Sequence, residues 1–242
     1  MSLLTMIQQA LKEIGEFEVP ATIISNTNPT ATQFLALAQR EGRELSRRHH
    51  WQALVTEKTQ TLTNGTEGYD LPADTRFVVH ATYHDRTNRY PMQGPLNASD
   101  WQFLKAEAAT GSRNRFFRTR GDQILIYPTP TAADTIAYEY VSDKYCQSSG
   151  GAAQNAWAAD ADVGRLDEEL MEAGLIWRFL QAKGLPSDRQ RGEYETLVTR
   201  AIARDGSKPT LQMGRRAGLR SNSYIPNTNS ITWSNTVLTW GS

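Results

Sequence analysis

The stretch FFRTRGDQILIYPTPTAADTIAYEYVSDKY, residues 116–145, predicts three short β-strands separated by turns. Gly121-Asp122 is a turn dipeptide, and residues 123–127 after it form an apolar run of strand length. Residues 128–130, Pro-Thr-Pro, end that strand because proline has no amide hydrogen for a β-ladder. Residues 135–142 then alternate in the manner of a half-buried antiparallel strand. An antiparallel β-region therefore lies at the centre of the chain.

Further strand signals precede this stretch. Asn64-Gly65 is a strong hairpin signal between residues 59–62 and 69–71. Residues 77–84 alternate between an apolar and a more polar face over the length of a strand. Residues 97–109 predict a short helix that interrupts the strands. We therefore expect the β-region to begin soon after residue 51.

Both flanks of the β-region have helical periodicity. Apolar residues at three- and four-residue spacing predict a helix over residues 3–14, which Gly15 can terminate. Asn28-Pro29 has the pattern of a cap followed by a first-turn proline, and it opens a helix that should end near Trp51. Two more helices are expected over residues 166–183 and 188–204.

Together these signals predict an α+β fold. In this fold the N- and C-terminal helices form one bundle, an antiparallel β-domain is inserted between them, and an extended tail follows. The expected parts are residues 1–51 and 151–205 for the bundle, 52–150 for the β-domain and 206–242 for the tail.

Charge is balanced overall and unevenly distributed along the chain. The 242 residues carry 26 basic and 26 acidic side chains and are 39% hydrophobic, enough for a substantial core. Residues 206–242 contain four basic side chains and no acidic one, so residues 1–205 have 22 basic against 26 acidic, a net charge of −4. We expect no membrane-spanning segment and no secretion signal. The single cysteine, Cys146, excludes an internal disulfide and indicates synthesis in a reducing compartment.

Two arginine clusters each have two interpretations. Arg47 and Arg48 lie at the predicted end of the second helix, where cations complement the helix dipole, but beside Trp51 they could also hold DNA phosphates. The other cluster surrounds Phe116 and Phe117. It can be interpreted as a solvent-exposed or subunit-facing row, or as a nucleic-acid contact. Its members are Arg113, Arg115, Arg118 and Arg120.

The C-terminal tail has no helical period and a composition typical of disordered ends. It also contains Trp233 and Trp240, whose large apolar side chains are unfavourable to leave in water, so we favour a segment that becomes ordered on a partner. The residues expected to bind there are Arg215, Arg216, Arg220, Tyr224, Ile231, Trp233 and Trp240.

No pattern in the sequence indicates catalysis or a cofactor. Glu168, Glu169 and Glu172 lie at the start of a predicted helix, where the helix dipole favours acids, so we interpret them as structural. His80 and His84, four residues apart on an extended strand, are roughly 13 Å apart and too distant to share one metal ion. We expect no catalytic residue, no metal site and no cofactor.

The order of these elements resembles that of the head-to-tail adaptor (connector) proteins of short-tailed bacteriophages. The residues that carry the resemblance are Trp51, YDLPAD at 69–74 with Arg76, IYPTP at 126–130, YEYVS at 138–142, GLIWRFLQAKGLP at 174–186 and EYE at 193–195.

The resemblance implies a structural virion protein that is made in the host cytoplasm and acts at the head–tail junction. Such adaptors form a ring, commonly of twelve copies, that docks below the portal protein, receives the tail nozzle protein and lets genome DNA pass. A competing interpretation is an OB-like nucleic-acid-binding module with residues 113–120 as its basic edge. The neutral overall charge weighs against this alternative.

Overall fold

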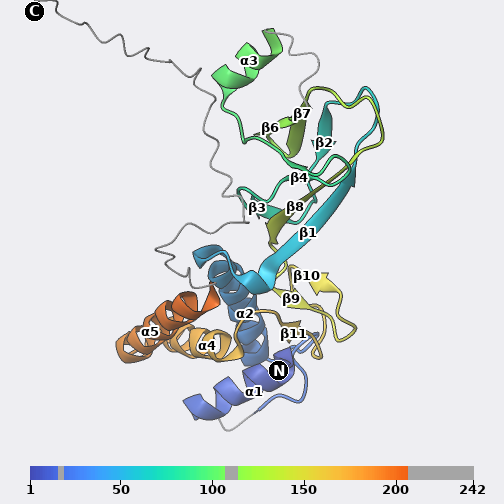
Figure 1. Ribbon diagram of the computed structural model, residues 1–242. Coiled ribbons are helices and arrows are strands. Elements are labelled where there is room, and N and C mark those ends of the chain that lie inside the picture. The colour runs from blue at the N-terminus through green and yellow to red at the C-terminus, as the bar shows by residue number, and fades with distance from the viewer. Residues whose placement is uncertain (16–18, 107–113, 207–242) are drawn as a thin grey trace, which may run out of the picture. The chain divides into compact units, whose positions relative to one another are not determined.

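A computed structural model describes residues 1–15, 19–106 and 114–206 (Figure 1). The described part contains five α-helices and one 3₁₀ helix, Gln52–Leu54. The α-helices are α1 (Leu3–Ile14), α2 (Pro29–Arg48), α3 (Ala98–Ala106), α4 (Glu168–Ala182) and α5 (Asp188–Asp205). Eleven short strands form antiparallel sheets. The predicted α+β class is confirmed, whereas the predicted domain boundaries stay predictions and the tail lies outside the described residues.

The helix ends follow their local signals. Gly15 ends α1 with φ 87°, a left-handed conformation that glycine adopts without strain. The side chain of Asn28 accepts a hydrogen bond from the Thr30 amide at 2.9 Å, and Pro29 occupies the first turn of α2. The side chain of Asp167 caps α4 through the Glu169 amide at 3.0 Å. These caps confirm the start or end predicted for each of these helices to within about two residues.

The helix α4 packs against α1, α2 and α5, so helices from both ends of the described chain share one apolar core (Figure 1). Its most apolar stretch, residues 174–180, is almost entirely buried. The aromatic rings of Phe34 on α2 and Phe179 on α4 stack with centroids 4.5 Å apart. The other large buried side chains of this core include Leu3, Ile7, Leu11, Leu45, Tyr145, Trp157, Leu175, Trp177 and Tyr194.

The strands form three separate sheets among the described residues. The largest contains β1 (Val55–Thr61), β3 (Thr75–Val78), β4 (His84–Asp85), β5 (Tyr90–Pro91) and β8 (Thr135–Ser142). The second contains β2 (Gly68–Asp70), β6 (Phe116–Arg120) and β7 (Gln123–Tyr127). The third contains β9 (Cys146–Gln147), β10 (Ala153–Gln154) and β11 (Val163–Gly164).

The strand β8 is the central strand of the largest sheet. It pairs with β1 along its whole length, from Val55 opposite Val141 to Thr61 opposite Thr135, and with β3 and β4 on its other edge. The three strands predicted in residues 116–145 are confirmed as β6, β7 and β8. The prediction that β8 is half-buried was wrong, because six of its eight residues are buried. Val141 enters the helical core, while Ile136 and Tyr138 join a second apolar cluster in the β-region.

Two other strand predictions were also wrong. Asn64-Gly65 does form a turn, but the strands on either side of it enter different sheets, since β1 pairs with β8 and β2 pairs with β7. The predicted strand over residues 77–84 is interrupted at Ala81, whose φ of 63° is incompatible with an extended chain, so it becomes β3 and β4. In both cases pairing with distant strands determines the outcome.

Candidate functional site

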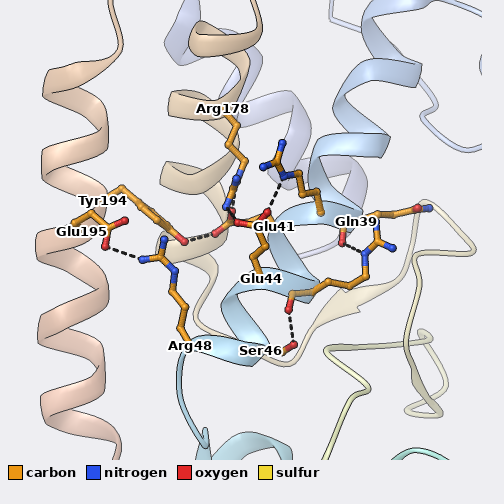
Figure 2. A network of polar contacts seen from close by, with 10 residues as sticks. Gln39, Glu41, Glu44, Ser46, Arg48, Arg178, Tyr194 and Glu195 are labelled. Carbon is orange, nitrogen blue, oxygen red and sulfur yellow. Dashed lines mark hydrogen bonds and ion pairs between the residues drawn. The ribbon is translucent and has the colours of Figure 1, made fainter. Parts of the chain in front are cut away.

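A buried polar network joins α2, α4 and α5 (Figure 2). Arg178 on α4 donates through Nε to Oε2 of Glu41 on α2 at 2.5 Å. The hydroxyl of Tyr194 on α5 donates to Oε1 of the same carboxylate, also at 2.5 Å. All three side chains are buried, so one carboxylate fixes the relative positions of three helices.

The network continues to the edge of the helices. Arg178 also donates through Nη2 to Glu44 at 2.7 Å, and Glu44 accepts from Arg40 at 2.7 Å. Arg48 donates to Glu195 on α5 at 2.7 Å, and its guanidinium lies 5.2 Å from the centre of the Tyr194 ring. Glu44 therefore connects α2 to α4 and Arg48 connects α2 to α5, whereas the Arg40–Glu44 pair lies within α2.

Two glycines allow close packing, Gly174 where α4 meets α2 and Gly42 where α2 meets the segment between β8 and β9. A Cβ on Gly174 of α4 would overlap the carboxylate of Glu41, and a Cβ on Gly42 of α2 would overlap the ring of Tyr145. Helix interiors normally disfavour glycine by roughly 0.5–1 kcal/mol relative to alanine. At Gly174 the missing side chain provides the space in which the buried carboxylate of Glu41 lies.

The network holds its charges in a dry environment. Burial raises the pKa of the Glu41 carboxyl, while the Arg178 guanidinium and the Tyr194 hydroxyl act in the opposite direction. Burial tends to lower the pKa of Arg178, but Glu41 and Glu44 outweigh it, so this pKa is raised. The pKa of Tyr194 is raised by burial and by Glu41. These pKa shifts are caused by burial and by other members of the network, so they reflect the pairing of the three helices.

A basic pocket of about 220 Å³ lies where α2 meets β3 and the end of β8. We use the name basic pocket for Arg43, Arg47, Thr75, Arg76 and Asp143. Three polar atoms in it are buried and have no hydrogen-bond partner among the described residues: Thr75 Oγ1, Arg76 Nη1 and Asp143 Oδ1. Burial and the neighbouring Arg47 lower the pKa of Arg76, while the Asp143 carboxylate acts in the opposite direction.

An acidic groove of about 240 Å³ lies between α1, α4 and α5. We use the name acidic groove for Glu13, Glu169, Glu172 and Glu193, which surround an apolar floor of Ala173, Ile176 and Leu197. Burial raises the pKa of Glu172, and the neighbouring Glu13 and Glu169 raise it further. Oε1 of Glu172 is buried without a partner in the described part of the chain.

The arginines singled out in the sequence have different environments. Arg47 is exposed at the basic pocket, whereas Arg48 is engaged with Glu195. Arg115 is largely buried between Asp85, to which it donates at 2.7 Å, and Asp134. On β6, Arg118 is half-buried and Arg120 exposed. Arg113 and all seven tail residues lie outside the described residues. The DNA and subunit contacts of these arginines stay predictions.

The remaining candidates fit structural roles. Glu168, the first residue of α4, pairs with the chain's amino terminus, and Asp167 is the N-cap of the same helix. The His80 ring packs edge-on against Phe77 at 5.2 Å. In residues 1–15, 19–106 and 114–206, no three His, Cys, Asp or Glu side chains are grouped closely enough to hold a metal ion. Burial raises the pKa of the Cys146 thiol to about 12, which makes it a poor nucleophile.

The sequence interpretation missed Glu41, Arg178 and Arg76. A usable signal existed for Arg178, because it interrupts the apolar run GLIWRFL at residues 174–180, and a cation within such a run requires a buried partner. Nothing comparable marks Arg76, whose surroundings come from α2 and β8.

The sequence was also compared with known protein families. The family described as SU10 adaptor protein matches residues 1–222. The chain belongs to this family. It is a phage head-to-tail adaptor, which makes it a virion component of the head–tail junction that interacts with other phage head and tail proteins.

Membership of the SU10 adaptor family agrees with the features above. Adaptors of this kind are structural proteins, which fits a network that holds helices together. No curated protein matches the chain. No helix in the described part of this adaptor has both the length and the apolar character needed to cross a bilayer.

Proposed function

We propose that this adaptor assembles as a dodecameric ring between the portal and the tail nozzle, and that genome DNA passes through the ring. The observation that carries the proposal is the family match over residues 1–222. A ring of this kind must stay rigid while DNA moves through it, and the buried Glu41–Arg178–Tyr194 network supports that requirement.

The proposed role is mechanical and needs no chemical step. Single replacement of Glu168, Glu169 or Glu172 by Gln should therefore remove no chemical step, and particles that assemble normally with such a variant should be infectious in a complementation assay. Loss of infectivity in one of these variants, with folding and assembly unchanged, would instead indicate a catalytic carboxylate.

We assign portal binding to the C-terminal tail. Its four basic side chains with no acid favour an acidic surface, and arginine can hold a carboxylate with two parallel hydrogen bonds. The residues proposed to make this contact are Arg215, Arg216, Arg220, Tyr224, Ile231, Trp233 and Trp240. The aromatic side chains provide the apolar area that basic residues alone lack.

The OB-like alternative is not favoured. An OB-fold is a five-stranded barrel, whereas the described strands of this chain form three separate sheets. Arg115, part of the proposed basic edge, is held by Asp85 and Asp134 and is largely buried.

The native mass of the purified protein, measured with and without a portal ring, tests the proposal. We expect a multimeric ring on the portal, with the nozzle protein joining only after the adaptor is present. A protein that stays monomeric and fails to bind the portal at micromolar concentration would overturn the proposal.

A further inference from the structure

The basic pocket and the acidic groove lie on opposite sides of the α2–α4 pair. Glu41 on α2 faces Gly174 on α4, which fixes the contact side of each helix. Arg43 and Glu172 each lie two residues from this contact, which corresponds to a rotation of about 200° around the helix axis. The arginine face of α2 therefore points away from α4, and the glutamate face of α4 points away from α2.

The basic pocket lacks the partners that its atoms require. Arg76 donates to the carbonyl of His49 at 3.3 Å through Nη2, but its Nη1 is buried and unpaired within the described residues. Arg43 donates through Nε to the carbonyl of Gln39 at 3.1 Å, but among the described residues neither Arg43 nor Arg47 makes an ion pair. A buried donor without a partner is destabilising, so a ligand that offers acceptors would be stabilised in this pocket.

The acidic groove has the complementary chemistry. Glu13 and Glu169 are exposed and make no ion pair in the described part of the chain, so they give the groove a negative charge beside the carboxyl of Glu172. Its apolar floor offers area that a partner can bury.

We infer that the basic pocket of one copy binds glutamate side chains of the acidic groove of the next copy, so that Arg43, Arg47 and Arg76 meet Glu13, Glu169 and Glu172. An interface between two different patches is heterologous, and it produces a closed ring when the rotation between copies closes. The inference rests on the proposed ring and identifies the surfaces that build it.

The pocket fits a protein segment better than DNA. Its buried unpaired atoms combine two groups that can donate, Thr75 Oγ1 and Arg76 Nη1, with the acceptor Asp143 Oδ1. A backbone phosphate offers acceptors only and would be repelled by Asp143. The acidic groove offers carboxylates for the arginines and the side-chain amide of Gln190 as a donor for Asp143.

Charge reversal tests the inference. Arg47→Glu and Glu169→Lys are examined singly and together, and Arg43→Glu with Glu13→Lys serves as a second pair in case one variant folds poorly. Arg200→Glu on the exposed side of α5 is the matched control. Thermal unfolding checks that each variant folds, and sedimentation measures self-association at low and high salt, with and without the portal.

Each single reversal should weaken self-association at least tenfold at low salt, and the double variant should recover much of it. The control should behave as the wild type, and salt should weaken wild-type association. If both single variants assemble as well as the wild type, the inference is overturned, but the proposed ring is not. If the wild type does not assemble even with the portal, both fail. Binding of each variant to a DNA duplex is measured as well. If Arg47→Glu weakens only that binding, the pocket is a phosphate site and the inference is overturned.

Discussion

The guanidinium of Arg178 and the carboxylate of Glu41 form a buried ion pair between α4 and α2, with Nε and Oε2 2.5 Å apart. Their exposed side-chain fractions are 3% and 0%. A buried pair of this kind contributes little net stability compared with apolar residues, but losing one partner leaves an uncompensated charge in the core. The pair therefore specifies how the helices meet.

Replacing Arg178 with Met should lower the free energy of unfolding by about 3–5 kcal/mol, because the Glu41 carboxylate loses its cation while it stays buried. The double variant Glu41→Gln/Arg178→Met should be more stable than Arg178→Met, since the amide is neutral and its oxygen still accepts from Tyr194. Urea unfolding at pH 7 measures both. A loss below about 1 kcal/mol in Arg178→Met would contradict the importance of the pair.

Gly174→Ala should destabilise the protein by about 1–3 kcal/mol, because the new methyl group would overlap the Glu41 carboxylate and overpack the core. The matched control is Gly192→Ala on α5, where a Cβ would meet no atom within 4 Å. This control should stabilise the protein by roughly 0.5–1 kcal/mol through helix propensity. Thermal unfolding distinguishes the two variants, and equal effects would contradict the close approach of α2 and α4.

Asp85→Asn should reduce the acid sensitivity of the fold. Burial tends to raise the pKa of Asp85, but hydrogen bonds from Asn88 and the guanidinium of Arg115 outweigh it and lower this pKa. A lowered pKa in the folded state contributes stability that is present above the unfolded value, about 3.9, and is lost as pH falls through the folded value.

The variant should therefore be less stable than the wild type at pH 7, by about 1–3 kcal/mol for a lost charged hydrogen-bond acceptor. It should lose less additional stability between pH 5 and pH 2. Urea unfolding at a series of pH values measures both quantities. Parallel curves for the variant and the wild type would show that Asp85 does not contribute to the acid response.

Deleting residues 207–242 should leave the described fold intact. The helix α5 ends at Asp205, whose carboxylate is retained and accepts from the amide of Gln52 at 2.9 Å. Thermal unfolding should be unchanged, while affinity for the portal should fall at least tenfold. A full-length variant with Trp233→Ser and Trp240→Ser should bind more weakly as well. Undiminished portal binding by the truncated protein would remove the role proposed for the tail.

Local chemistry determined much of this fold, and the sequence alone was sufficient to predict it. Gly15 and Asn28-Pro29 mark helix ends, and the prolines after residue 127 mark the end of β7, because caps and prolines act within a few residues. The strand β8 was predicted with its observed bounds because its alternation is continuous.

Tertiary structure decided which elements meet. The turn at Asn64-Gly65 is present, but long-range pairing sends its flanking strands into different sheets. Glu41 and Arg178 are 137 residues apart, and a local pattern can indicate that Arg178 needs a partner without identifying it. The basic pocket is likewise assembled from α2, β3 and the end of β8. Burial and ion pairing depend on residues brought together by folding, and for that reason these contacts follow only from the three-dimensional arrangement.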